Sequence, residues 1–225
     1  MFNFEDVKIN NFDLKILKSD IFSNNNLKHF FSTRLGGNTP SPLNSFTLSA
    51  KDYTNYDNFA KDNLKIACKI LDGDFNNLII PNQQHTDNIA VLKNTIDIKK
   101  LEDNGVDGIV TNLKNYPVCL VFADCVPVLL FDEQEEVLAC VHAGWKGTAK
   151  KIAPQAVEIM KKEFNSKVEN ISVVIGPAIC QNCFEVNYDV ASQLGIDNIK
   201  DYDNIFISKQ AKWKLVDNVI HITIE

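Results

Sequence analysis

The stretch VPVLLFDEQEEVLACVHA, residues 126–143, decides the fold. Its apolar parts, 126–131 and 136–143, are rich in branched residues and have the length of buried strands. The charged run DEQEE between them is typical of an exposed turn. Apolar segments at 117–123 and 171–177 predict two more buried strands. The middle of the chain therefore predicts a sheet at the centre of the molecule.

Weaker patterns surround these strands. Apolar residues at helical spacing predict a helix over 55–72 and an amphipathic helix over 147–164. Pro154 requires that the second helix begins near it or bends. Shorter elements are expected as strands at 27–34, 77–81, 88–93 and 107–111, a turn at 23–26 and a helix at 187–194. Strands in the middle with flanking helices predict an α+β fold around a central β-sandwich or a large mixed sheet. The last thirty residues show no clear periodicity.

The bulk composition narrows the class of protein. The chain has 225 residues, 45% of them hydrophobic and 23% charged, which suits one large globular domain. A net charge of −6 without a dense Lys/Arg stripe argues against nucleic acid as the main partner. The N-terminus lacks an apolar signal region, and no segment approaches the ~18 apolar residues of a membrane helix. We therefore expect a cytoplasmic protein with no membrane partner and with reduced cysteines.

Three residues beside predicted strands form a candidate metal site. His85 follows a strand in PNQQHTD, Cys125 separates two strands in FADCVP, and His142 ends the strand 136–143. Two imidazoles and one thiolate suit zinc, and three protein ligands leave a fourth position open for water, as in catalytic zinc sites. In the alternative interpretation, Cys125 is a core thiol and the two histidines are unrelated.

A further interpretation is a nucleophile pair, in which Cys125 attacks and His142 acts as its base. Asp124 could orient His142, although adjacent residues on an extended chain point to opposite sides. His29 and His221 have the settings of ordinary packed or surface histidines.

The other cysteines carry weaker signals. Cys180 and Cys183 form a C-x-x-C without the second pair that a zinc ribbon needs, which favours core or turn residues over a redox or metal role. Cys68, Cys119 and Cys140 lie within helix or strand patterns and are expected in the core.

Two cationic segments indicate an anion site. In WKGTAKK, Thr148 could cap a helix whose free N–H groups point outward beside Lys146. Arg34 lies on a loop rich in Gly and Pro. The alternative for each is a solvated surface charge. STRLGG is not a Walker loop, and the chain contains no GxGxxG, so nothing indicates ATP or a dinucleotide.

Six motifs occur in the order STRLGG, LIIPNQQH, DGIVTN, ADCVPVLLFD, VHAGWKGTAKKI and IGPAICQNCFEV. From about residue 27 to 190, the chain thereby resembles the YfiH-like family, also labelled multicopper polyphenol oxidase or laccase domain. The resemblance implies one zinc ion per chain, held by His85, Cys125 and His142. It implies phosphorolysis of adenosine, inosine and methylthioadenosine, together with deamination of adenosine. It also implies a layered α/β/β/α domain around a central mixed β-sandwich.

The laccase label conflicts with the composition. A multicopper oxidase binds its coppers through roughly ten histidines and a cysteine. This chain has only four histidines and cannot build such a centre.

The chain departs from the family pattern at several positions. Lys146 replaces the usual Arg and loses bidentate phosphate recognition, Thr86 replaces Gly, and Phe184 replaces Tyr. The sequence ends at HITIE without the Arg-rich segment usual in the family. We therefore expect one domain over 1–225 that lacks this C-terminal segment, with its site either impaired or completed by a partner chain.

The resemblance implies a purine nucleoside and phosphate as partners. For deamination, zinc would activate a water near C6 of the purine, with Asp124 as the proton-transfer candidate. For phosphorolysis, the phosphate ligands would be Arg34, Lys146 and the helix start near Thr148. Gln83 could bind the base or the ribose. The alternatives are a Cys125/His142 cysteine hydrolase acting on an amide or peptidoglycan precursor, and a non-catalytic nucleoside-binding remnant.

Overall fold

The computed structural model describes residues 1–23, 27–41, 43–49, 56–99, 101, 105–180, 183–186, 188–195, 211–216 and 219–224. Its strands are β1 (Phe2–Ile9), β2 (Phe12–Ser19), β3 (Phe31–Ser32), β4 (Ile89–Leu92), β5 (Gly108–Thr111), β6 (Val126–Asp132), β7 (Val137–Ala143), β8 (Ile171–Ile175), β9 (Glu185–Val186), β10 (Ala211–Val216) and β11 (Val219–Ile224). Its helices are α1 (Asp57–Ile70), α2 (Thr95–Lys99), α3 (Trp145–Ala149), α4 (Ile152–Phe164) and α5 (Tyr188–Gln193). Short 3₁₀ turns occur at Asp20–Phe22, Phe75–Asn77 and Val168–Asn170.

A five-stranded mixed sheet forms the centre of the molecule, in the order β4-β5-β7-β6-β8. The pair β4–β5 is parallel and the other pairs are antiparallel. The predicted strands at 126–131 and 136–143 are β6 and β7, joined by the predicted turn and paired so that Pro127 lies opposite His142. Strands predicted at 88–93, 107–111 and 171–177 are also present as β4, β5 and β8. The expected burial of the last was wrong, because β8 is an edge strand with Val173 and Ile175 exposed.

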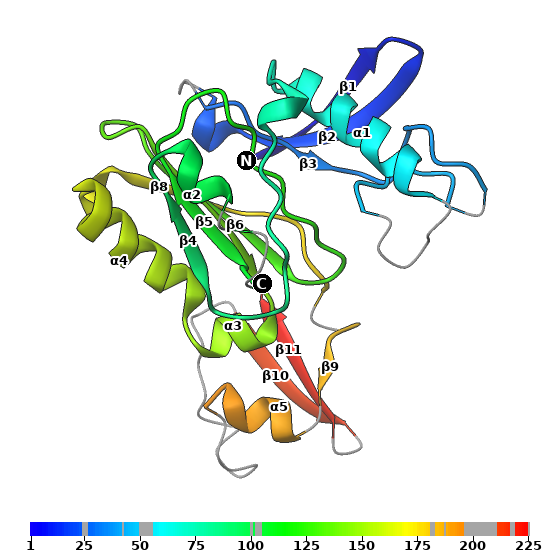
Figure 1. Ribbon diagram of the computed structural model, residues 1–225. Helices are drawn as coiled ribbons and strands as arrows, with labels where there is room; N and C mark the ends of the chain where they lie inside the picture. Colours follow the sequence, from blue (N-terminus) through cyan, green and yellow to red (C-terminus); the bar gives the residue numbers. More distant parts are fainter. Residues whose placement is uncertain are drawn as a thin grey trace.

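Different elements cover the two faces of this sheet (Figure 1). On one face, Ile152, Ala156 and Met160 of α4 are fully buried against β5, β6 and β7. On the other face, Phe22 packs with Phe131 of β6 and Val174 of β8. The predicted α+β class with a mixed sheet is therefore confirmed. In the described residues, no helix is long and apolar enough to span a membrane.

The N-terminal elements form a second sheet, β1-β2-β3. The sequence pattern indicated only its last strand, which was predicted over 27–34 and is limited to Phe31–Ser32. Ile9 pairs with Phe12 across a two-residue turn in which Asn10 adopts a φ of 54°. Nearly all of β1 is exposed, so it lacks the alternating burial that identifies a strand. The predicted helix at 55–72 is α1. Its Ile66 and Ala67 pack with Leu14 of β2.

The helix predicted over 147–164 is in fact two helices. Lys151 has a φ of 62°, which ends α3 and starts α4 in a new direction. Pro154 then lies in the first turn of α4, where a missing N–H costs no helical hydrogen bond. The prediction that the proline needs a helix start or a bend is therefore confirmed.

The strands predicted at 77–81 and 117–123 are reduced to one parallel bridge between Ile79 and Val118. Two backbone bonds make this bridge, from Ile79 N to Pro117 O and from Cys119 N to Ile79 O. The rest of 117–123 has no strand partner and is held by a side chain, as described below. Apolar composition alone was therefore misleading for these two segments.

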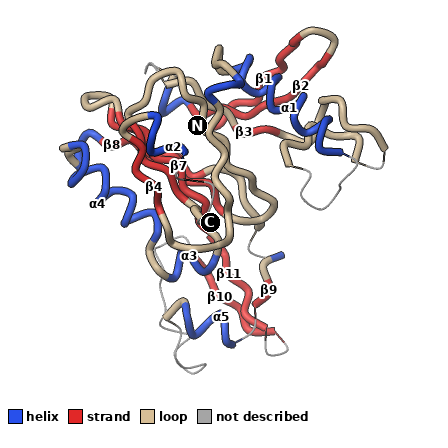
Figure 2. Tube along the Cα trace, viewed as in Figure 1, coloured by secondary structure: helices blue, strands red, loops and turns tan. Residues whose placement is uncertain are grey.

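The C-terminal strands form a third sheet, β10-β11-β9, next to α5 (Figure 2). The helix predicted at 187–194 is confirmed as α5. The two strands β10 and β11 pair antiparallel, although the last thirty residues had shown no periodicity. The turn predicted at 23–26 falls mostly outside the described residues.

Candidate metal centre

The three candidate ligands meet at one edge of the central sheet because of its strand directions. Strands β4, β5 and β6 begin at this edge, and the antiparallel β7 ends there. His85 precedes β4, Cys125 immediately precedes β6, and His142 lies near the end of β7. Segments separated by many residues are thereby brought to one place.

The ligand atoms of His85, Cys125 and His142 all lie within 4.8 Å of one another. The two imidazole rings meet edge to face with centroids 4.8 Å apart, and Phe122 covers His142 at 5.3 Å. His142 is 3% exposed, Cys125 is half-buried and His85 is exposed. The triplet therefore opens to solvent on the His85 side.

Asp107 organises this site, and the sequence interpretation had missed it. Its carboxylate is fully buried and lies 2.7 Å from Nδ1 of His142. It also accepts hydrogen bonds from the backbone N–H groups of Gln84, His85 and Thr86 and from the Thr86 hydroxyl. A signal for it existed in the sequence, because an acidic residue in the otherwise apolar GVDGIVT needs buried partners.

The carboxylate determines which nitrogen of His142 can bind a metal. Burial raises the pKa of Asp107, but hydrogen bonds from His142, Thr86 and Gln84 outweigh this effect and leave the pKa below its usual value. An ionised carboxylate only accepts hydrogen bonds, so Nδ1 of His142 carries the proton. Its Nε2 is then left with a lone pair, as a metal ligand requires.

The same carboxylate holds the loop that carries His85. The backbone of His85 is left-handed, with a φ of 57°, which non-glycine residues rarely adopt. The bond from its N–H to Asp107 and the two bonds from Thr86 stabilise this conformation. The Thr86 hydroxyl thus helps to secure the loop.

Gly144 leaves room for an ion between the ligands. A Cβ atom at this position would lie 3.2 Å from Sγ of Cys125, 3.2 Å from the His85 ring and 3.8 Å from the His142 ring. Its φ of −68° suits any residue, so space rather than backbone conformation favours glycine here. The donor set and this gap both fit a single bound metal ion.

Cys125 is a thiol with a raised pKa when no cation is present. Burial is the largest cause, followed by the negative charges of Asp124 and Asp107. Metal binding requires the thiolate and would release this proton.

Two residues proposed for catalysis or substrate binding make contacts of their own. Gln83 donates to the carbonyl of Val121 at 2.9 Å and accepts from its N–H at 2.8 Å, so its amide substitutes for a strand partner. Asp124 is exposed beside Cys125, and its carbonyl accepts from Ile179 N–H. Asp107, not Asp124, contacts and orients His142.

The predicted phosphate ligands are all exposed. Lys146 lies in α3, with its ammonium 5.5 Å from the Trp145 ring centroid. Thr148 is inside α3 and does not cap a helix, because the N-caps of α3 and α4 are Gly144 and Lys151. The prediction that Thr148 is a cap was therefore wrong.

Arg34 is exposed on the 34–47 loop. Asn63 of α1 holds this loop, because it accepts from Asn38 N–H and donates to Thr39 and to the carbonyl of Thr47. A role for Arg34, Lys146, Thr148 or Gln83 in substrate binding stays a prediction.

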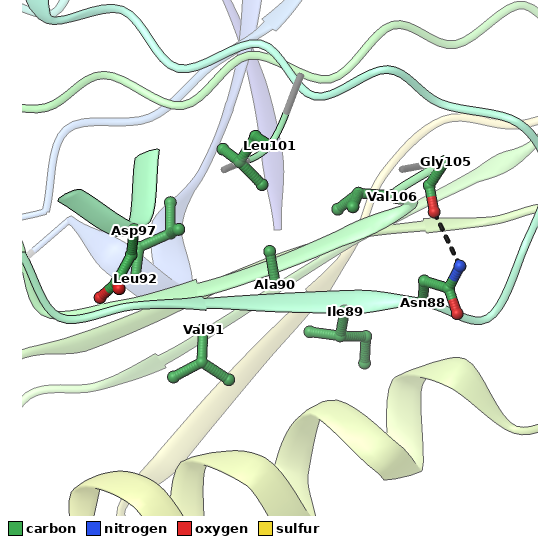
Figure 3. A pocket seen from close by; sticks show the side chains of 9 residues that line it. All are labelled: Asn88, Ile89, Ala90, Val91, Leu92, Asp97, Leu101, Gly105 and Val106. Atoms are coloured by element: carbon green, nitrogen blue, oxygen red, sulfur yellow. Dashed lines mark hydrogen bonds between the residues drawn. The ribbon is translucent and has the colours of Figure 1, made fainter. Parts of the chain in front are cut away.

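A cavity of about 440 Å³ lies elsewhere, along the edge strand β4 (Figure 3). Its lining combines apolar side chains, such as Ala90, Leu101 and Val106, with polar groups. The side-chain amide of Asn88 is bonded to the carbonyl of Gly105. Among the described residues that line the cavity, none is a histidine or a cysteine.

The remaining sequence expectations concern the other histidines and cysteines. His29 is a packed residue whose Nε2 accepts from Ser19 N–H at 3.0 Å, as expected. Cys68 and Cys140 are buried and Cys119 is half-buried, consistent with core thiols. The side chain of His221 lies outside the described residues.

Comparisons with known proteins place the chain among related sequences. A protein from an unknown prokaryotic organism, named adenosine deaminase RL5, is 39% identical over 52% of this chain and 46% of its own length. A protein of Bacteroides thetaiotaomicron, named purine nucleoside phosphorylase, is 31% identical over 75% of this chain and 64% of its own length. The chain thus spans about half to two-thirds of the length of these relatives.

The fold has a close match among solved structures. The crystal structure of the hypothetical protein YfiH from Bacillus licheniformis covers 92% of this chain and 76% of its own, with a TM-score of 0.75 at 24% identity. The predicted YfiH-like fold is therefore confirmed. The sequence model of the family described as multi-copper polyphenol oxidoreductase laccase matches residues 28–220, and the chain belongs to this family.

Proposed function

We propose that the chain is a zinc-dependent purine nucleoside phosphorylase that also deaminates adenosine. The observation that carries this proposal is the convergence of His85, Cys125 and His142 within 4.8 Å, with His142 oriented by Asp107. Relatives named purine nucleoside phosphorylase and adenosine deaminase support the substrate class. We propose adenosine, inosine and methylthioadenosine as nucleosides and phosphate as the co-substrate.

Zinc suits this donor set better than copper. One thiolate and two imidazoles are typical zinc ligands, and four histidines in the whole chain are too few for a multicopper centre. A zinc ion bound there would supply Lewis-acid chemistry, polarising an oxygen and lowering the pKa of a water.

The surrounding residues would bind and orient the reactants. Phosphorolysis joins phosphate to C1′ of the ribose and releases the purine base, so it needs cations that hold the phosphate. Lys146 lies in α3, which begins shortly after the end of β7 where His142 is located. Lys146 and Arg34 are our candidates for holding the phosphate. Asp124, exposed beside Cys125, is our candidate for proton transfer during deamination.

The test measures metal content and adenosine turnover of the purified chain, with and without phosphate. About one zinc per chain and adenine release only with phosphate would support the phosphorylase, whereas inosine formed without phosphate would indicate the deaminase. Cys125→Ala should lose metal and activity together. The matched control Cys183→Ala, at an exposed cysteine outside the triplet, should retain the metal.

The same assay separates the alternatives. Activity that survives chelation but not thiol alkylation would indicate the Cys125/His142 hydrolase instead. Nucleoside binding without turnover would indicate a binding protein. A chain with neither metal nor turnover would overturn the proposal.

A further inference from the structure

Two exposed cysteines lie where the chain passes from the central sheet to the C-terminal sheet. Cys180 follows β8, and Cys183 precedes β9, which pairs with β11. All six cysteines of the chain are described, and only these two are exposed. Neither belongs to the metal triplet.

The local backbone brings the two thiols together. The N–H groups of Cys183 and Phe184 both donate to the carbonyl of Cys180, at 3.0 and 3.1 Å. The two Sγ atoms are 3.1 Å apart. Two thiols at this distance need only a small side-chain movement to form a disulfide.

The segment before this turn is anchored beside the metal centre. Ile179 N–H donates to the carbonyl of Asp124 at 2.9 Å, and Gly176 N–H donates to the carbonyl of Pro127 at 2.8 Å. These bonds flank Cys125 on both sides in the sequence. Cys180 therefore directly follows a backbone segment that is anchored beside Cys125.

The core cysteines are less accessible to reagents in solution than the exposed pair Cys180 and Cys183. Burial raises the pKa of Cys119 and of Cys140 to about 12, so their thiols stay protonated at neutral pH. Cys68 is buried as well. The pKa of Cys183 is also raised, by its hydrogen bond with Cys180, so exposure rather than the pKa distinguishes the pair, which a disulfide in solution reaches before the core thiols.

We propose that Cys180 and Cys183 form a redox-active dithiol that small-molecule disulfides, such as glutathione disulfide, oxidise reversibly to an intramolecular disulfide. One cysteine thiolate attacks a sulfur of glutathione disulfide, which forms a mixed disulfide and expels one glutathione thiolate. The second cysteine thiolate attacks the cysteine sulfur of that mixed disulfide and expels the second glutathione. Two protein thiols are oxidised, one glutathione disulfide is reduced to two thiols, and the two protein protons pass to the glutathiones.

The test equilibrates the reduced full chain, under native conditions, with glutathione buffers of rising disulfide content. Acid quenching, alkylation of the remaining thiols and peptide mass analysis then locate each oxidised cysteine. We expect the peptide containing both residues to lose two alkylation sites and two hydrogen masses, and to regain them with dithiothreitol. The four other cysteines should stay alkylatable after denaturation.

Single variants test ring closure. Cys180→Ser and Cys183→Ser should each stop at a mixed disulfide carrying one glutathione. Two intact thiols at 180 and 183 in excess glutathione disulfide would overturn the proposal. So would wild-type mixed disulfides that never close to a ring, or a disulfide that involves another cysteine. None of these readouts depends on the proposed nucleoside reaction.

Discussion

Oδ1 of Asp107 lies 2.7 Å from Nδ1 of His142, and the same carboxylate binds three consecutive backbone N–H groups of the loop that carries His85. One buried acid therefore positions two of the three candidate ligands. The third, Cys125, is placed independently by the pairing of β6 with β7.

Asp107→Asn should weaken metal binding. An amide at this position cannot accept every bond that the carboxylate accepts, and it can leave Nδ1 of His142 without its acceptor. We expect zinc affinity to fall about 10–100-fold, as for other groups that orient metal-binding histidines, measured by competition with a chelator. The matched control Asp87→Asn, a half-buried acid paired with Lys150, should leave zinc affinity unchanged. Equal losses in both variants would contradict this role for Asp107.

Gly144→Ala should crowd the ion without disturbing the backbone. The added methyl group would lie 3.2 Å from both Sγ of Cys125 and the His85 ring, whereas a φ of −68° is open to alanine. We expect zinc binding to weaken by about 1–3 kcal/mol, the range for overpacking, with an unchanged far-ultraviolet spectrum. Unaltered zinc affinity would show that the ion does not occupy this gap.

Gln83→Ala should reduce stability. Both polar groups of the Gln83 side chain are bonded to Val121, so their loss leaves two backbone groups without partners. We expect the free energy of unfolding to fall by about 1–3 kcal/mol in urea denaturation. Gln155→Ala, which removes an exposed hydrogen bond to the carbonyl of Lys150, is the control and should change stability far less. If Gln83→Ala instead raised KM for the nucleoside at unchanged stability, Gln83 would be a substrate ligand.

His29 should make stability depend on pH. Burial, followed by the charge of Lys18, lowers the pKa of His29 below its usual value, and its neutral Nε2 accepts from Ser19 N–H. In the unfolded chain, the pKa of a histidine is about 6.5. Between this pKa and the lower pKa of folded His29, the unfolded chain therefore binds more protons than the folded chain. The stabilisation is therefore complete above about pH 6.5 and is lost as pH falls through the lower folded pKa.

Urea unfolding of metal-free protein between pH 5 and 8 checks the His29 prediction. His29→Gln keeps an acceptor for Ser19 but cannot titrate, so its free energy of unfolding should fall less on acidification than that of the wild type. Identical pH profiles for the two proteins would rule out this contribution of His29.

The sequence predicted the central strands better than the outer elements. The apolar segments β6 and β7 are buried on both faces and are long enough to be recognised by composition alone. The hairpin β1–β2 was not predicted because β1 is exposed and lacks an alternating pattern of burial. The segment 117–123 was wrongly predicted as a strand, because the Gln83 side chain, rather than a strand, pairs with Val121. The first failure arises from the exposure of β1, and only the second arises from a partner that is distant in the sequence.

By itself, the sequence determined which chemistry is available: two histidines and one cysteine at strand ends, too few histidines for a multicopper centre, and strands that must be buried. Only the tertiary structure decided that these ligands meet, because strand order and direction bring residues 85, 125 and 142 to one edge of the sheet. It also decided that Asp107 orients His142, since hydrogen bonding depends on distance and direction in space, which a one-dimensional pattern does not contain.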